Sequence, residues 1–200
     1  MPVQVIGLAG SPRRGGNTET LLDQALAGAA SVGAATEKIV ISRLRLSPCR
    51  GCERCFETGR CVIQDDYQQL YDRLLAAEGV IVAAPIYFVG VNAQTKAMID
   101  RCQCLWARRY VLRAPLPPTP SGLPRWGGFV SAAGDARTDF ACAVETVRAF
   151  FATLRARYAG DVFARAVDER GEVQRRPELL AQAFKLGVDL IKKIGGLDDR

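Results

Sequence analysis

The stretch that decides the fold runs Val3-Gln4-Val5-Ile6-Gly7-Leu8-Ala9, then Gly10-Ser11-Pro12-Arg13-Arg14-Gly15-Gly16-Asn17-Thr18. Its first seven residues form a short, nearly continuous apolar run, which is typical of a strand buried on both faces of a parallel sheet. The glycine-rich segment 10–16 predicts a loop, and Asn17 or Thr18 can cap the helix that follows. The stretch therefore predicts a strand, a loop and a helix, the first unit of an α/β fold.

The same alternation continues along the rest of the chain. Further strands are expected at 37–42, 79–84, 126–133 and 162–167, and further helices at 65–77, 92–109, 138–158 and 177–194. Five such units predict a flavodoxin-like, doubly wound fold: a five-stranded parallel sheet in the order 2-1-3-4-5 with helices on both faces. We expect residues 1–200 to form one domain, with a cysteine-rich loop inserted at about 43–64.

Composition excludes several classes of function. The chain has no histidine, so His-based acid–base catalysis, Ser-His-Asp hydrolysis and histidine-ligated metal centres are excluded. The net charge is +6, but the arginines are scattered, so we expect no nucleic-acid partner. We expect no membrane span, because no apolar run approaches about 18 residues. The N-terminus does not resemble a signal peptide, so we expect a cytoplasmic protein, in which seven cysteines favour metal or redox chemistry over disulfides.

The loop at 10–17 has features of an anion site. It lacks the Lys-Ser/Thr ending of a P-loop and the G-x-G-x-x-G pattern of a dinucleotide site. Ser11, Asn17 and Thr18 offer polar side chains at a helix N-terminus, where the dipole favours an anion. The segment therefore predicts binding of a single terminal phosphate, and the alternative is a glycine-rich turn with a capping asparagine.

Two more loops are expected at the carboxyl ends of the strands, where doubly wound folds bind their ligands. In segment 85–91, Tyr87 and Phe88 would pack on a flat ring or simply close the core. Segment 131–137 begins with small residues, which permit close approach by a ring system and equally suit a tight turn. These two segments and the loop at 10–17 are therefore the candidate ligand site.

Four cysteines, Cys49, Cys52, Cys55 and Cys61, follow the spacing C-x2-C-x2-C-x5-C. A CxxC turn directs two thiolates at one centre, and a third at the same spacing suits a compact cluster with several iron corners. Three interpretations stay open: a [4Fe–4S] cluster, a structural zinc site, and free or redox-active thiols. The remaining cysteines are expected to pack in the core or at an interface: Cys102, Cys104 and Cys142.

Three stretches together resemble the iron–sulfur flavoprotein branch of the NADPH-dependent FMN reductase family: LAGSPRRGGNTETLL at 8–22, PCRGCERCFETGRCVIQDD at 48–66 and APIYFVGVNAQTKAMIDR at 84–101. The resemblance implies a flavodoxin-like fold, bound FMN and a homodimer or homotetramer. It assigns the FMN phosphate to Ser11, Arg13, Asn17 and Thr18. It assigns the isoalloxazine to Pro85, Ile86, Tyr87, Phe88, Ser131 and Gly134. It assigns a [4Fe–4S] cluster to Cys49, Cys52, Cys55 and Cys61.

These observations lead to one functional hypothesis with three rivals. The leading hypothesis is an FMN-dependent oxidoreductase that takes electrons from NAD(P)H or a small electron carrier, with the cluster as a one-electron port. No catalytic side chain is expected, because the cofactor carries the chemistry. The rivals are a non-enzymatic electron-transfer protein, a plain NAD(P)H:FMN reductase whose cysteines bind zinc or no metal, and a zinc-stabilised binding module without flavin. Expected partners are small-molecule donors or acceptors and a ferredoxin-like protein.

Overall fold

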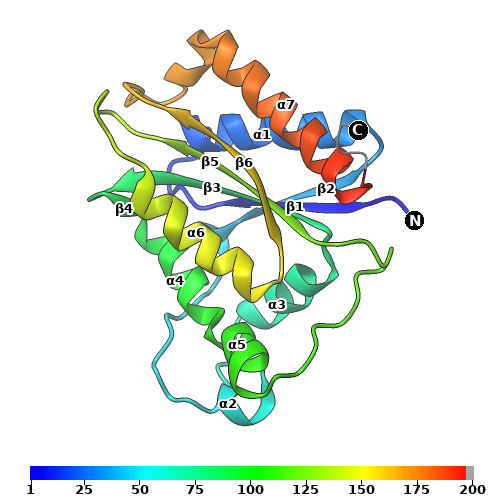
Figure 1. Cartoon of the computed structure of the whole chain (residues 1–200). Helices are drawn as coiled ribbons and strands as arrows, with labels where there is room; N and C mark the ends of the chain where they lie inside the picture. The colour runs from blue at the N-terminus through cyan, green and yellow to red at the C-terminus, as the bar shows by residue number, and fades with distance from the viewer. Residues whose placement is uncertain (197–200) are drawn as a thin grey trace.

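A parallel sheet runs through the centre of the computed structural model, which describes residues 1–196 (Figure 1). Its strands are β1 (Gln4–Ala9), β2 (Ala35–Val40), β3 (Gly79–Tyr87), β5 (Trp126–Ala132) and β6 (Arg157–Ala164). They lie in the order β2-β1-β3-β5-β6, and each neighbouring pair is parallel. This arrangement confirms the predicted flavodoxin-like fold with its 2-1-3-4-5 order. A sixth, two-residue strand, β4 (Gly90–Val91), was not predicted and pairs antiparallel with the end of β3.

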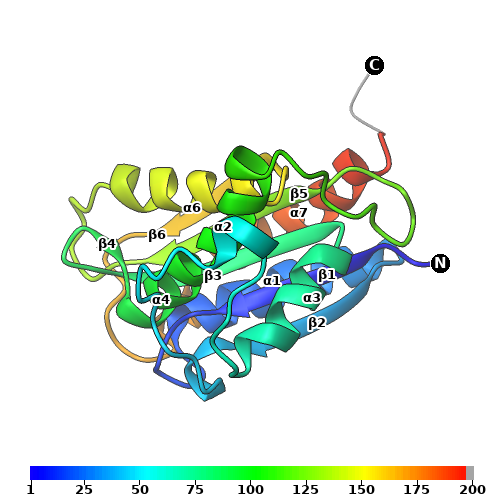
Figure 2. The same ribbon diagram turned by 90° about the horizontal axis from the view of Figure 1, so that it is seen from below.

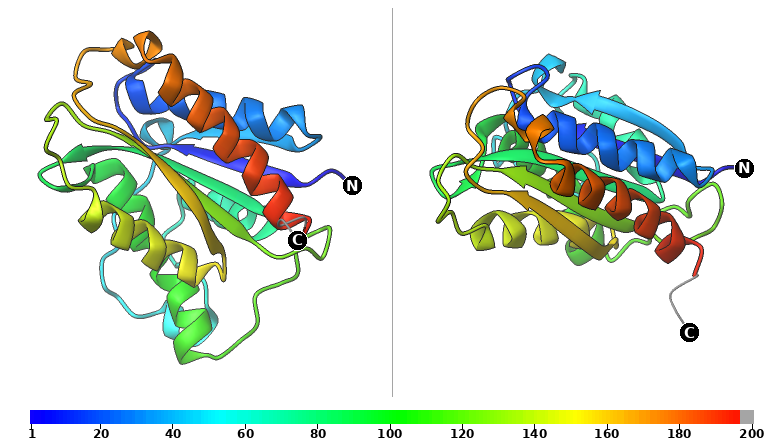
Figure 3. Two further views of the ribbon diagram at one scale, coloured as in Figure 1. Left: turned by 45° about the horizontal axis from the view of Figure 1, so that its top comes forward. Right: turned by 90° about the horizontal axis from the view of Figure 1, so that it is seen from above.

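Helices cover both faces of the sheet, as expected for strands that are buried on both sides. One face carries α1 (Asn17–Ser31) and α7 (Pro177–Ile194) (Figure 3). The other face carries α3 (Tyr67–Ala76), α4 (Ala93–Arg101) and α6 (Ala141–Thr153) (Figure 2). The side chains of β1 alternate between these two cores, because successive residues of a strand point to opposite faces. Val5 and Ala9 pack with α1 and α7, whereas Ile6 and Leu8 pack on the opposite side.

The α1–α7 pair is fastened by glycines at its crossing. A Cβ atom on Gly28 would overlap the carbonyl oxygen of Phe184, and one on Gly187 would overlap that of Ala25. The two helices therefore approach to backbone contact, and only glycine fits at both positions. This close packing holds the second half of α1 against α7 on this face of the sheet.

Segment 92–109, expected as one helix, is broken in the structure. After α4, the chain turns at Cys102, whose ψ is 4°, and continues as α5 (Gln103–Trp106) and a π-helical turn, η2 (Ala107–Val111). Cys102 and Cys104, on either side of this turn, are both buried.

The expected helix 138–158 and strand 162–167 also have different boundaries. Helix α6 ends at Thr153, and β6 begins at Arg157, five residues before the predicted strand. The reason is that β6 is an edge strand whose first half is largely solvent-accessible, so it lacks the apolar run of a buried strand. Similarly, the strand predicted at 37–42 is β2 at 35–40, followed by a 3₁₀ turn, η1 (Ile41–Arg43).

The inserted segment, residues 44–66, connects η1 to α3 and is called here the cysteine loop. It contains one short helix, α2 (Cys55–Thr58), which lies beside α5 and η2 (Figure 1). A second 3₁₀ turn, η3 (Glu172–Arg175), precedes α7. None of the helices within residues 1–196 combines the length and apolar character needed to cross a bilayer.

Candidate functional site

A cavity of about 70 Å³ lies at the carboxyl edge of the sheet. The parallel register brings its walls together, because Ala9 pairs with Ala83 and Pro85 pairs with Ala132. Eight of the ten residues predicted to bind the flavin line this cavity: Ser11, Arg13, Asn17, Thr18, Pro85, Ile86, Tyr87 and Gly134.

The loop at 10–18, called here the phosphate loop, is fixed against the start of α4. Gly10 donates its N–H to the Ala83 carbonyl at 2.8 Å and accepts a 2.7 Å hydrogen bond from the Asn92 side chain. Thr95 in turn donates to Asn92 Oδ1 at 2.7 Å, and both side chains are buried. A Cβ on Gly10 would overlap Thr95 Oγ1, so the close approach of loop and helix requires glycine at position 10.

Asn17 uses its side chain to hold a different loop. Its Nδ2 donates to the Glu169 carbonyl at 2.8 Å, and its Oδ1 accepts the Val173 N–H at 3.1 Å. Both ends of the amide are thus engaged with segment 167–173. What position 17 offers a ligand in this arrangement is its backbone N–H, because the first N–H groups of a helix have no partner within it.

The loop after β6 completes the cavity, and sequence reasoning missed it. Val167, Asp168 and Arg170 line the wall opposite the phosphate loop. Arg13 Nη1 donates to the Asp168 carbonyl at 3.0 Å, so the two loops are joined directly. The signal was available, because the rule that ligands bind at the carboxyl ends of parallel strands applies to the fifth strand as well as to the first, third and fourth.

Two predicted flavin residues lie outside the cavity lining. Ser131 is fully buried, and its hydroxyl donates to the Ala84 carbonyl at 2.6 Å, which ties β5 to β3. Phe88 is fully exposed in the two-residue turn between β3 and β4. Phe88 and Val89 both have positive φ, 48° and 71°, an uncommon conformation for such residues. The turn therefore holds two apolar side chains in solvent at a cost in backbone strain.

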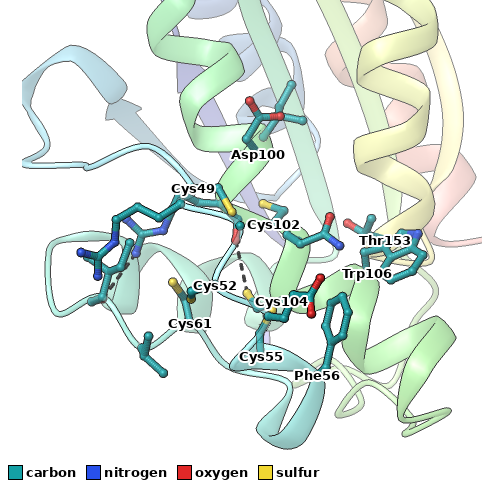
Figure 4. A pocket seen from close by; sticks show the side chains of 18 of the residues that line it. Cys49, Cys52, Cys55, Phe56, Cys61, Asp100, Cys102, Cys104, Trp106 and Thr153 are labelled. Carbon is teal, nitrogen blue, oxygen red and sulfur yellow. Dashed lines mark hydrogen bonds between the residues drawn. The ribbon is translucent and has the colours of Figure 1, made fainter.

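A larger cavity, about 530 Å³, lies beneath the cysteine loop, between α4–α5 and the end of α6. All four cysteines of the C-x2-C-x2-C-x5-C pattern line it, joined by two cysteines of the α4–α5 segment (Figure 4). Phe56 and Trp106 form an aromatic wall, with ring centroids 6.0 Å apart. The structure thus brings together the thiols of Cys49, Cys52, Cys55, Cys61, Cys102 and Cys104.

The four loop thiols are close enough to influence one another. Burial raises the pKa of Cys55, and the negative charges of Cys49, Cys61 and Cys52 raise it further. Mutually repelling thiolates are relieved by a cationic centre, which fits the donor set of an iron–sulfur cluster. Within residues 1–196, no three Cys, Asp or Glu side chains are already placed to hold a metal ion.

Cys102 and Cys104 have a different character. Both are buried, as expected for core cysteines, and the Tyr67 hydroxyl lies 3.3 Å from Cys104 Sγ. Burial raises the pKa of Cys104 to about 11 and that of Cys102 further still. These two residues are therefore held as neutral thiols at neutral pH.

Comparison with known protein families shows to which family this chain belongs. The family described as NADPH-dependent FMN reductase matches residues 3–169. The chain belongs to the NADPH-dependent FMN reductase family. This membership agrees with the resemblance carried by the phosphate loop, the cysteine loop and segment 84–101.

Known relatives of this FMN reductase family member match over part of their length. An iron-sulfur flavoprotein of Methanocaldococcus jannaschii is 43% identical over 52% of this chain and 53% of its own. Another, from Methanosarcina thermophila, is 38% identical over 56% of this chain and 58% of its own. The chain thus spans little more than half the length of these two relatives. The NAD(P)H:quinone oxidoreductase of Methanothermobacter marburgensis shares the fold, with a TM-score of 0.67 at 15% identity over 95% of this chain and 100% of that chain.

Proposed function

We propose that this chain is an FMN-dependent oxidoreductase that passes electrons from NAD(P)H, or from a small electron carrier, through a flavin at the carboxyl edge of its sheet. The observation that carries the proposal is the convergence of the phosphate loop with segments 85–87 and 132–134 on one cavity. Beside that cavity, α1 begins, and a helix N-terminus stabilises a bound phosphate through its N–H groups and dipole. Membership in the FMN reductase family supports the same cofactor.

The chain's own residues would bind and orient the flavin. The guanidinium groups of Arg13 and Arg170, which line the cavity, would pair with the phosphate, together with the N–H groups of the first turn of α1. Segment 85–87 and Gly134 would border the ring, because they lie on the cavity's remaining wall. FMN, when bound, supplies the hydride and one-electron chemistry that no side chain here provides.

We further propose that Cys49, Cys52, Cys55 and Cys61 hold a [4Fe–4S] cluster, which would supply a one-electron port toward a ferredoxin-like or small-molecule partner. Two observations support this. The four thiols line one cavity although they come from an irregular loop, and two archaeal relatives carry the name iron-sulfur flavoprotein. We also propose that the protein is cytoplasmic and forms a homodimer or homotetramer, which would cover the exposed side chains of Phe88 and Val89.

The test is anaerobic purification followed by reconstitution with FMN, iron and sulfide. FMN, iron, acid-labile sulfide and zinc are then measured per chain, together with NADH and NADPH oxidation. We expect one FMN per chain, iron and sulfide in equal amounts, and reductant oxidation that depends on the flavin. Protein that neither retains FMN nor quenches its fluorescence would refute the proposal.

Two cysteine variants separate the two cofactors. Cys52→Ser should lose iron and sulfide but retain FMN, because the cavities that would hold the two groups share no lining residue. Cys142→Ser is the matched control, since Cys142 is exposed on α6 and lies outside both linings. Zinc in place of iron, or FMN without any metal, would leave a plain FMN reductase and overturn the cluster assignment.

A further inference from the structure

The cysteine loop is closed at its two ends by a short hydrogen-bonded neck. Arg45 donates its backbone N–H to Asp66 Oδ2 at 2.7 Å, and the Asp66 N–H donates to the Arg45 carbonyl at 3.2 Å. One step further in, the Ser47 N–H donates to Asp65 Oδ2 at 2.9 Å. The neck thus joins the residues just before Cys49 to those just after Cys61.

Arg101, the last residue of α4, fastens this neck to the scaffold. Its Nη1 donates to Asp65 Oδ2 and to the Ser47 carbonyl, both at 2.7 Å. Its Nη2 donates to Asp65 Oδ1 at 3.0 Å and to the Ile63 carbonyl at 3.4 Å. The guanidinium therefore bonds to both ends of the cysteine loop, and it also lies over the Tyr67 ring at 4.6 Å.

The remaining donor of this guanidinium has no partner among the described residues. The Arg101 side chain is 0% exposed, and its Nε is buried without a hydrogen bond. Arg101 also lines the cavity that the four loop cysteines surround. A buried N–H that stays unpaired is costly, so an arginine that served only to close the neck would leave this cost uncompensated.

The other arginine in that lining is Arg50, which is exposed on the loop itself. Arg101 differs because it comes from a regular helix, is excluded from water and is aligned by a bidentate pair with Asp65. A donor fixed in this way acts on a neighbouring anion without first giving up bound water. Arg101 is therefore a fixed cation, excluded from water, at the wall of the cavity that the loop cysteines surround.

We propose that Arg101 is a positioning residue for the group held by Cys49, Cys52, Cys55 and Cys61: its Nη atoms close the cysteine loop, and its Nε–H donates to a sulfur of that group. The inference rests on the proposed cluster. Hydrogen bonds to sulfur and nearby positive charge stabilise the more negative, reduced state of a cluster. Arg101 should therefore raise the affinity of the loop for iron and also raise the reduction potential.

The experiment compares Arg101→Gln and Arg101→Lys with wild-type protein, all reconstituted with FMN, iron and sulfide. We expect Arg101→Gln to bind iron about 10- to 100-fold more weakly, as is typical when a residue that supports metal ligands is lost. We expect Arg101→Lys to retain more iron than Arg101→Gln, because lysine keeps the positive charge although it cannot form the bidentate pair with Asp65. The cluster that remains in either variant should have a more negative midpoint potential, measured by titration with spectroscopic detection.

The matched control is Arg45→Gln. It removes the exposed guanidinium at the same neck, while the backbone hydrogen bonds of residue 45 to Asp66 stay in place. This variant should keep wild-type iron content and potential. The midpoint potential distinguishes a positioning role of Arg101 from a merely structural one. A merely structural role would lower the iron content without shifting the midpoint potential. Variants at position 101 with wild-type iron content and potential would refute the role of Arg101.

Two further controls, a test of folding and a double variant, make the result decisive. Retained FMN and far-ultraviolet circular dichroism report whether each variant folds. If the single variants do not fold, a double variant with Asp65→Leu and Arg101→Met replaces the buried ion pair with apolar side chains, a change that proteins often tolerate. This double variant should show the same loss of iron affinity and the same negative shift of the midpoint potential. Wild-type protein without iron and sulfide would refute the proposed cluster together with this inference, whereas iron-loaded wild type with unaffected variants would refute the inference alone.

Discussion

The phosphate loop and the cysteine loop differ in how closely their backbones pack against the scaffold. In the phosphate loop, Gly10 lies so close to its neighbours that a Cβ there would overlap Thr95 Oγ1, and its N–H donates to the Ala83 carbonyl. The cysteine loop is held by side chains of α3 and α4. Besides Arg101, Gln68 Nε2 donates to the Cys61 carbonyl at 2.7 Å, and the Tyr71 hydroxyl donates to the Gly59 carbonyl at 3.1 Å.

This difference has a consequence for how each site tolerates change. A loop that packs this closely against buried neighbours loses its geometry when a side chain is added there. A loop fixed by individual side chains weakens in steps, one hydrogen bond at a time, and leaves the sheet intact. A substitution in the phosphate loop should therefore leave the cysteine loop unaffected, and the reverse should hold as well.

The largest effect is expected from Gly10→Ala. Its new Cβ would overlap Thr95 Oγ1 and lie 3.0 Å from the Ala83 carbonyl oxygen, so the phosphate loop must move away from α4. We expect loss of retained FMN and a decrease of about 1–3 kcal/mol in the free energy of unfolding, as is typical of overpacking. Iron content per folded chain should not change. FMN content, iron content and denaturant unfolding measure these three quantities.

Gly128→Ala is the control for Gly10→Ala. It also adds a methyl group to a buried glycine of the sheet, but that Cβ would meet Leu186 at an ordinary 3.4 Å. It should leave FMN in place. If Gly10→Ala removed iron as completely as it removes FMN, the two regions would not be independent, and the comparison would fail.

A second prediction concerns the thiols within the cysteine cavity. In metal-free protein, Cys49 and Cys52 are exposed on the loop, whereas Cys104 is buried on the scaffold. Burial raises the pKa of Cys104 to about 11 from an ordinary 9.0, so about 100-fold less of it is thiolate at pH 8. We expect iodoacetamide to modify the two loop cysteines at least about 100-fold faster than Cys104.

Peptide mapping by mass spectrometry after timed alkylation measures these rates, with exposed Cys142 as the internal reference. Raising the pH toward 11 should speed modification of Cys104, because more of it becomes thiolate. If Cys104 reacted as fast as Cys52 at pH 8, the cavity would open to its inner wall. The contrast between exposed loop thiols and buried scaffold thiols would then be lost.

The sequence predicted the sheet order, and most of the residues predicted for the phosphate loop and its neighbouring loops line one cavity, for physical reasons. Strands β1, β3 and β5 are buried on both faces, so each of them has a nearly continuous run of apolar residues in the sequence. The edge strand β6 has no such run, and its position was predicted five residues too late. The loop that follows β6 lies at the same carboxyl edge, but it carries no recognisable binding motif, so Asp168 and Arg170 were not expected at the site.

The cysteine site was predicted in part. The spacing of its four cysteines is visible in the sequence, whereas the residues that position them are not. Nothing in the pattern of positions 92–109 distinguishes Arg101 from an exposed helical arginine. Its burial depends on the turn at Cys102 and on Asp65, which is far away in the sequence. A buried ion pair between distant elements has no local signal, so only the three-dimensional structure reveals it.

The smallest expected effect concerns Glu19, a side-chain support within the phosphate-loop region. Glu19 Oε2 accepts the Gly15 N–H at 2.7 Å, and Oε1 pairs with Lys38 Nζ at 2.9 Å. Burial alone would raise the pKa of Glu19, but the hydrogen bonds from Lys38 and the Gly15 N–H lower it below its ordinary value. Because the pKa is lower in the folded state, this stabilisation is complete above the unfolded value of about 4.5 and is lost as the pH falls through the folded value.

Glu19→Gln keeps an acceptor for the Gly15 N–H and removes the charge. We expect it to lower the free energy of unfolding at pH 7 by less than about 1 kcal/mol, the usual range for an accessible ion pair. The difference from wild type should shrink as the pH is lowered from 7 toward 3, measured by urea unfolding at each pH. Glu145→Gln removes the exposed pair with Arg148 and is the control: it should leave the free energy of unfolding unchanged at both pH 7 and pH 3. A Glu19→Gln penalty as large as that of Gly10→Ala, or one that persists in acid, would mean that a side-chain hydrogen bond matters as much to the phosphate loop as the close packing at Gly10, and the distinction between the two regions would disappear.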